Sequence, residues 1–243
     1  MSTASGRYSA LHEWYQTPLG QVLASSITGE LEKCLSTLFG HYLLQIGIPE
    51  QNFWLAHSPS KQRLVMGSSL ATGLCDFYGA TSALPIQSEV IDTCFLPHTL
   101  ELTSNPQLFL AEIERILIPE GHVIILGFNP YSWWGLKKLL NRSRQSPWQN
   151  HWLAPFTVSR LLQSHGFDVN ELKSFFYRPP LANPHLLAKS QFLEPVGRAL
   201  WPYPGGVYLI VAQKRVAQMM PIRPIWNVGG YVLGKRSLTT TTT

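Results

Sequence analysis

The sequence predicts an α/β domain built on a mostly parallel sheet with helices on both faces. Short apolar runs alternate with helical patterns between residues 41 and 140, as in βαβ units. Helix starts are marked by a capping residue followed by proline, as at Thr17-Pro18 and Asn105-Pro106. Two late strand patterns, at 169–177 and 207–212, have no parallel crossover pattern between them, which predicts an antiparallel edge strand.

Length and composition fit one folded domain. The chain has 243 residues, and 45% of them are hydrophobic, which is enough to build a full core. No apolar run reaches the roughly 18 residues of a membrane-spanning helix, and the polar start at residues 1–6 lacks the order of a signal peptide. Cys34, Cys75 and Cys94 are odd in number and scattered, so they predict no disulfide framework and no metal site. We therefore expect a cytoplasmic protein with reduced cysteines.

The first half of the chain predicts one helix and four strands. The helix begins at Pro18, where apolar residues follow at spacings of mainly three and four up to Leu38, and Gly40 ends it. A buried strand over 41–47 then ends at a glycine. Three further apolar runs predict strands, and they lie at 63–66, 76–78 and 90–96.

The clearest helix opens the second half. Its apolar residues between Phe109 and Leu117 share one face, and charged residues lie elsewhere. A turn at Pro119-Glu120-Gly121 leads into a buried strand over 122–127.

Two shorter helices follow. Asn129-Pro130 repeats the cap-and-proline signal and predicts a helix that runs to Leu140. Residues 157–165 predict another short helix, which Gly166 closes.

These elements divide the chain into three parts. We expect a flexible N-terminus over 1–12, one domain over 13–215 and a basic, disordered tail over 216–243. A proline-rich insertion over about 178–206 interrupts the domain between its last two strands.

Charge is unevenly distributed along the chain. Residues 1–135 contain 5 Lys and Arg against 11 Asp and Glu, a net charge of −6, whereas residues 136–243 contain 14 against 3, a net charge of +11. Such a basic half often contacts an anionic partner, for which nucleic acid and an anionic membrane surface are the candidates. The tryptophan-bearing stretch 137–152 is where either would bind. A solvated basic face without a partner explains the same charges.

Three central segments carry a family resemblance. They read Leu84-Pro85-Ile86-Gln87-Ser88-Glu89-Val90-Ile91-Asp92-Thr93-Cys94, then Glu112-Ile113-Glu114-Arg115-Ile116-Leu117-Ile118-Pro119-Glu120-Gly121-His122, and finally Gly127-Phe128-Asn129-Pro130-Tyr131-Ser132-Trp133-Trp134-Gly135-Leu136. The first two resemble the type 11 domain of the class I S-adenosylmethionine-dependent methyltransferases. The third is similar to a small bacterial branch of methyltransferase-domain proteins. The resemblance covers roughly residues 13–215.

The resemblance implies a Rossmann-like, seven-stranded sheet that holds S-adenosylmethionine at the carboxyl ends of strands one to four, as in other open α/β sheets. It places five residues of this chain at the cofactor, and they are Gln45, Gly47, Ser68, Leu84 and Leu96.

This chain departs from the family at three cofactor positions. The acidic and glycine-rich motif reads Gln45-Ile46-Gly47-Ile48-Pro49-Glu50-Gln51, the second strand ends at Met66-Gly67-Ser68 without an acid, and Ala80 stands where the family has aspartate. Each lost charge-assisted hydrogen bond weakens cofactor binding by about 1.5–3 kcal/mol. Asp76 or Glu50 is a candidate substitute.

Two residues are candidates for catalysis. His98 follows the fourth strand, where this fold places substrate-facing groups, and a histidine there can act as a general base. Glu101, three residues later, can orient it on one helical face, although a solvated glutamate is the alternative. Asn129 is the second candidate, with a helix cap as its alternative.

Other chemistry is less well supported. Trp133 and Trp134, with Lys137 and Lys138, can line a substrate wall, or one tryptophan can belong to the core. The histidines have no metal-ligand spacing, so no metal is expected.

Two functions stay open. The first is methyl transfer to an unidentified small-molecule or macromolecular acceptor, for which an anionic compound is one option. The second is an inactive methyltransferase fold that acts as a scaffold and uses its basic half to contact an anionic partner.

Overall fold

The computed structural model describes residues 4–56, 58–67, 75–140, 147–148, 150–180 and 205–215. Its centre is a seven-stranded sheet with the order β3-β2-β1-β4-β5-β7-β6. The strands are β1 (Tyr42–Ile46), β2 (Gln62–Gly67), β3 (Phe77–Tyr78), β4 (Ile91–Pro97), β5 (Leu117–Phe128), β6 (Phe167–Phe175) and β7 (Val207–Lys214).

The sheet is mostly parallel, as predicted. Strands β3, β2, β1, β4 and β5 pair in parallel. Strand β7 runs antiparallel to both of its neighbours, β5 and β6, at one side of the sheet. This arrangement confirms the Rossmann-like fold and the antiparallel pairing of the last strands.

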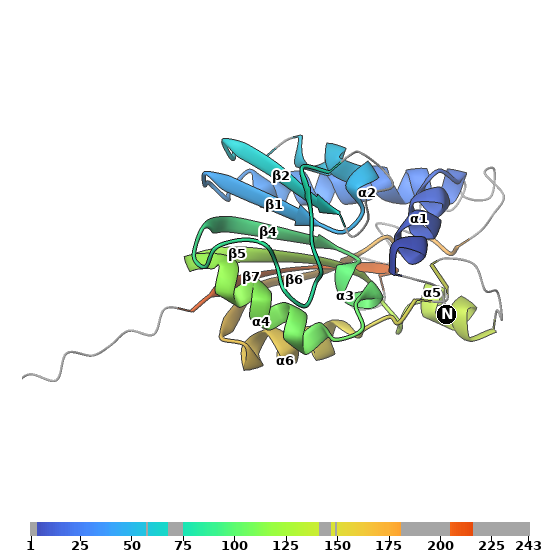
Figure 1. Ribbon diagram of the computed structural model, residues 1–243. Helices are drawn as coiled ribbons and strands as arrows, with labels where there is room; N and C mark the ends of the chain where they lie inside the picture. The colour runs from blue at the N-terminus through green and yellow to red at the C-terminus, as the bar shows by residue number, and fades with distance from the viewer. Residues whose placement is uncertain are drawn as a thin grey trace, which may run out of the picture.

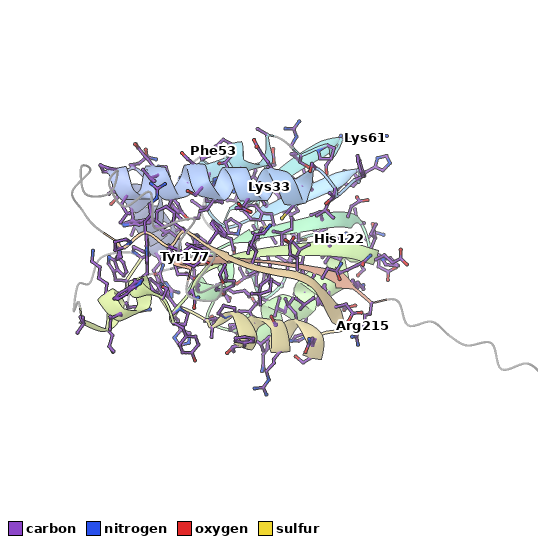
Figure 2. All side chains as sticks on the ribbon, turned by 180° about the vertical axis from the view of Figure 1, so that it is seen from behind. Lys33, Phe53, Lys61, His122, Tyr177 and Arg215 are labelled. Carbon is purple, nitrogen blue, oxygen red and sulfur yellow. The ribbon has the colours of Figure 1, made fainter. Side chains whose placement is uncertain are left out.

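Helices cover both faces of the sheet (Figure 1). One face carries α2 (Pro18–Leu35) and the 3₁₀ helix η1 (Pro49–Leu55), and the other carries α4 (Pro106–Ile116) and α6 (Pro155–Ser164). Figure 2 shows the sheet from behind, with Lys33 on α2 and Phe53 on η1.

Each face of the sheet has its own hydrophobic core. In β4, Phe95 packs into the core beneath α2, whereas Cys94 and Leu96 pack into the core beneath α4. This alternation follows from the two-residue period of a strand. Because both faces are covered, β4 is buried along most of its length and mostly apolar, although it includes Asp92 and Thr93.

The predicted helix caps are confirmed at two helices. The Thr17 hydroxyl accepts a hydrogen bond from the backbone N–H of Gly20, and Pro18 is the first helical residue. The Asn105 side chain accepts from the N–H of Leu108 in the same way.

The N-terminus differs from the prediction. Residues Ala4–Tyr15 form a helix, α1, where a flexible segment over 1–12 was expected. Its sequence has no clear apolar period, so the pattern alone does not reveal the helix. Tyr8, Leu11 and Tyr15 are nevertheless buried in the core beneath α2. Tertiary packing therefore decides the conformation of this segment.

Two boundaries in the second half also differ. Strand β5 begins at Leu117, and the expected turn is an irregularity in its pairing with β4, where Glu120 has a φ of 62°. Helix α5 (Trp133–Leu140) begins three residues later than Pro130, because Ser132 rather than Asn129 accepts the N–H groups of its first turn.

The insertion over 178–206 and the tail over 216–243 lie almost wholly outside the described residues. In the part of the chain that the structure describes, no helix has the length and apolar character to span a bilayer.

Candidate active site at the carboxyl ends of the strands

Three helices gather where the parallel strands end (Figure 1). They are α1 at the start of the chain, α3 (Thr99–Leu102) after β4, and α5 after β5. In Figure 2, Tyr177 lies at the carboxyl edge, which is the end of the sheet where the parallel strands terminate. Lys61, His122 and Arg215 lie at the opposite end, where the parallel strands begin. The candidate site lies at the carboxyl edge, where open α/β sheets bind their ligands.

His98 occupies the turn between β4 and α3 in an unusual conformation. Its φ and ψ are 56° and 11°, in the left-handed region that residues with a Cβ rarely enter. Its N–H donates to the carbonyl of Leu126 over 2.8 Å, and its own carbonyl accepts from the N–H of Glu101. Backbone strain of this kind is concentrated at functional sites.

The His98 ring lies between a hydroxyl and a carboxylate. The Tyr15 hydroxyl is 2.7 Å from Nε2, and Glu101 Oε2 is 3.4 Å from Nδ1. All three side chains are buried. In such an order of hydroxyl, imidazole and carboxylate, the carboxylate orients the imidazole and stabilises its protonated form.

Glu101 is fixed by the backbone of the neighbouring strand. Its Oε1 accepts the N–H of Phe128, the last residue of β5. The other oxygen, Oε2, faces the imidazole. The alternative of a solvated glutamate is therefore wrong. The two side chains do come together, but His98 precedes α3 in a left-handed turn, so they do not share one helical face.

Burial keeps the Tyr15 hydroxyl protonated. Desolvation, together with the nearby Glu101 carboxylate, raises the pKa of Tyr15 well above its ordinary value. The Glu101 carboxylate can only accept, so it favours the imidazole tautomer that carries its proton on Nδ1. In that tautomer His98 Nε2 accepts from the Tyr15 hydroxyl.

An aromatic stack extends from His98 towards α5. The His98 ring stacks on Phe128 with 4.3 Å between centroids, and Phe128 stacks on Trp152 at 5.0 Å and on Trp134 at 5.8 Å. Trp134 also meets Trp148 at 5.7 Å. Trp134 is therefore the tryptophan that belongs to the core, as one of the two interpretations expected.

Two lysines of α5 lie against this stack. Lys137 Nζ is 5.1 Å from the Trp148 ring and donates to the carbonyl of Pro180, and Lys138 Nζ is 4.5 Å from the Trp152 ring. Burial lowers the pKa of both lysines.

Gly47 ends β1 in a conformation that suits glycine. Its φ is 139°, and a Cβ there would lie 2.8 Å from Thr99 Oγ1 and 3.1 Å from the carbonyl oxygen of Pro97. The Thr99 hydroxyl donates to the carbonyl of Ile46 over 2.5 Å. The ends of β1 and β4 are thus in direct contact at Gly47.

The other predicted cofactor residues have different surroundings. Gln45 is buried, and its amide donates to the carbonyl of Ile48 over 2.7 Å. Leu84 and Leu96 pack in the core beneath α4. Ser68 lies outside the described residues.

Asp76 and Asn129 have structural contacts. The Asp76 carboxylate accepts the N–H of Val65 within β2, which ties it to the strand rather than to a ligand. Asn129 is buried at the end of β5, and its Oδ1 accepts the N–H of Tyr131 in the turn before α5. Asn129 therefore orders this turn, close to its expected capping role.

A cleft of about 440 Å³ opens beside the site. Its lining comes from the end of α1, from α2 and from η1, and consists of Tyr15, Gln16, Gln21, Ala24, Ser25, Thr28, Gln51 and Phe53. This volume falls in the range of small-molecule sites. Tyr15 belongs both to the cleft and to the contact with His98.

The sequence pattern missed Tyr15. It lies 83 residues before His98 and belongs to a helix without a clear apolar period. The only local signal near Tyr15 is the cap at Thr17, which predicts the start of the next helix but not the position of Tyr15. Among the described residues, no group of three or more His, Cys, Asp and Glu side chains is arranged to hold a metal ion.

Residues 60–125 match a family model described as a methyltransferase domain of type 11. The match runs from the start of β2 into β5 and includes His98 and Glu101. The chain is also 28% identical over 204 residues to the uncharacterized protein YafS of Escherichia coli (strain K12), covering 83% of this chain and 80% of that protein.

Solved structures share the fold. A SAM-dependent methyltransferase from Thermotoga maritima is 19% identical with a TM-score of 0.62, covering 84% of this chain and 94% of its own. One from Archaeoglobus fulgidus is 14% identical with a TM-score of 0.55, covering 79% and 94%. The [4+2]-cyclase SpnF is also 14% identical, at 0.55, covering 79% and 80%. The same fold thus serves more than one reaction, and the chemistry must be argued from the site.

Proposed function

We propose that this chain, whose fold is that of the class I methyltransferases, transfers a methyl group from S-adenosylmethionine to a nucleophilic acceptor that His98 deprotonates. The observation that carries the proposal is the buried Tyr15–His98–Glu101 arrangement at the carboxyl end of β4. The match of residues 60–125 to the methyltransferase domain supports it.

Unpaired acceptors near the end of β1 fit the cofactor. Gln45 Oε1 and Gln51 Oε1 are buried and accept no hydrogen bond from any described residue. A buried acceptor without a partner is unfavourable by about 1–3 kcal/mol, and the ammonium group of a bound S-adenosylmethionine would satisfy it. We therefore assign these two glutamines to holding the amino-acid end of the cofactor, beside Gly47.

When bound, S-adenosylmethionine supplies an electrophilic methyl group, so the protein has to provide orientation and a base. His98 Nε2 would take the proton from the nucleophilic atom of the acceptor, which could then receive that methyl group and leave the demethylated cofactor behind. The resulting imidazolium is stabilised by Glu101, which faces Nδ1. Glu101 in turn is held by the N–H of Phe128.

Tyr15 indicates what kind of acceptor group fits. Its hydroxyl donates to the atom of His98 that would receive the acceptor's proton. A hydroxyl or an amine of the acceptor would make the same hydrogen bond once α1 has moved aside. Lys138 favours an anionic acceptor, because an anion would offset the unfavourable burial of its ammonium group.

The experiment is a calorimetric titration of the full chain with S-adenosylmethionine and with its demethylated product. We expect micromolar binding that weakens about tenfold in Gln51→Met, because a charge-assisted hydrogen bond is lost. The matched control is Gln87→Met at an exposed glutamine, which should bind like the parent protein.

Absence of binding at millimolar ligand would overturn the proposal. In that case the scaffold function, in which the methyltransferase fold is kept without its chemistry, becomes the better explanation. Binding without turnover on any acceptor bearing a hydroxyl or an amine would point the same way.

A further inference from the structure

Helix α5 presents its apolar side chains to the outside of the molecule. Tyr131, just before the helix, and four residues within it are between 45% and 81% exposed, and those four are Trp133, Leu136, Leu139 and Leu140. Singly exposed apolar residues are common, but a contiguous group marks an interaction surface.

The polarity of α5 is inverted relative to an ordinary surface helix. At about 100° per residue, the four exposed residues fall within about 120° of the helix circumference. The opposite side carries Lys138 and Trp134, which is buried, and Lys137 lies at the border between the two sides. Both lysines turn towards Trp148 and Trp152. The lysines therefore face the protein and the leucines face away from it.

The charge around α5 has one sign. Residues 121–167 contain no Asp or Glu and five Lys or Arg, which are Lys137, Lys138, Arg142, Arg144 and Arg160. Arg142 and Arg144 lie outside the described residues, but a stretch of sequence with this charge complements an anionic partner.

We propose that Tyr131 and the outer side of α5 form a docking surface for an anionic lipid membrane. Leucine and tryptophan side chains enter the boundary between headgroups and acyl chains, and basic residues nearby attract the negative headgroups. Tyrosine and tryptophan are also the aromatic residues enriched at membrane interfaces. This proposal does not depend on the proposed catalytic activity.

The residue types favour a membrane over a nucleic acid. Leu139 and Leu140 are the most exposed members of the group, and an aliphatic side chain gains nothing from a phosphate backbone. Nucleic-acid surfaces instead present basic groups and stacking aromatic rings. In Figure 1, α5 lies beyond the carboxyl ends of the parallel strands.

The test is flotation of the full chain with vesicles of phosphatidylcholine, alone or mixed with phosphatidylglycerol. We expect binding to the mixed vesicles that falls as salt is raised. The double variant Leu139→Glu with Leu140→Glu should bind at least about tenfold more weakly, because two apolar groups are lost and two negative charges are added.

The matched control is Phe39→Glu. Phe39 is 79% exposed, and it lies between α2 and β1, at the opposite edge of the sheet. This variant has the same kind of substitution away from the docking surface and should bind vesicles about as well as the parent protein. Circular dichroism melts of all variants establish that each is folded.

Three results would overturn the proposal. The first is no binding of the parent protein to either vesicle type, and the second is equal binding by the double variant. The third is a dimer in sedimentation equilibrium that Leu139→Glu with Leu140→Glu dissociates, without vesicle binding. That last outcome would assign the surface to a second copy of the chain.

Discussion

The hydroxyl of Tyr15 lies 2.7 Å from Nε2 of His98, which joins the first helix of the chain to the end of β4. Two residues separated by 83 positions thus share one buried hydrogen bond. Its loss affects both the stability of the fold and access to the imidazole.

Tyr15→Phe should reduce the free energy of unfolding by about 1–3 kcal/mol, because it leaves a buried acceptor on His98 without its donor. The ring packing against Trp54 at 5.5 Å remains. Urea denaturation measures the change. Tyr131→Phe, at an exposed tyrosine, is the control and should leave the unfolding midpoint unchanged.

His98→Asn should abolish most methyl transfer while S-adenosylmethionine still binds. Asparagine tolerates the left-handed conformation better than other residues with a Cβ, so the turn after β4 is kept and the base is removed. Loss of a general base lowers turnover by about 10²–10⁴-fold. His151→Asn, at an exposed histidine, should retain full turnover. Equal turnover in His98→Asn would remove His98 from the mechanism.

Gly47→Ala should destabilise the fold by more than about 2 kcal/mol. The added Cβ would meet Thr99 Oγ1 at 2.8 Å in a backbone conformation that alanine rarely adopts. Gly29→Ala is the opposite case, because this glycine lies inside α2 and a Cβ there meets nothing within 4 Å. That variant should be more stable than the parent protein by about 0.5–1 kcal/mol. Thermal unfolding of the two variants compares them, and an unchanged melting temperature in Gly47→Ala would contradict the close contact.

The ion pair on α4 gives a pH-dependent contribution to stability. The Arg115 guanidinium, 2.9 Å away, is the main cause of the lowered pKa of Glu112, and the N–H of Leu84 adds to it. A carboxylate with a lowered pKa stabilises the folded state above its unfolded pKa, near 4.5. That stabilisation is lost as the pH falls through the folded value.

Glu112→Gln should therefore be less stable than the parent protein at pH 7, and the difference should shrink below about pH 4. Urea midpoints measured between pH 3 and pH 7 test this. The control is Glu114→Gln on the same helix. Glu114 accepts no hydrogen bond from the N–H of Leu84, and its ion-pair partner is Lys214 instead of Arg115. A difference for Glu112→Gln that grows as the pH falls would contradict the assignment.

Local signals in the sequence predicted most of the sheet. The strands over 41–47 and 90–96 are mostly apolar, and they match β1 and β4 to within about a residue or two. The caps at Thr17 and Asn105 fixed the starts of α2 and α4 because a side-chain acceptor and a following proline act within one turn.

Features that depend on distant contacts were not predictable. Helix α1 owes its burial to Tyr8, Leu11 and Tyr15, which pack against residues far along the chain. Exposure of Glu101 to solvent was one of the two interpretations of the sequence, because charged residues are usually exposed. Its burial depends on the N–H of Phe128 in the adjacent strand.

The complete burial of His98 beneath α1 has a kinetic consequence. In the proposed reaction, an acceptor reaches Nε2 only after Tyr15 has left it, so acceptor capture includes an opening of α1. The observed rate constant for capture should then level off at high acceptor concentration, at a value set by the opening of α1 rather than by diffusion.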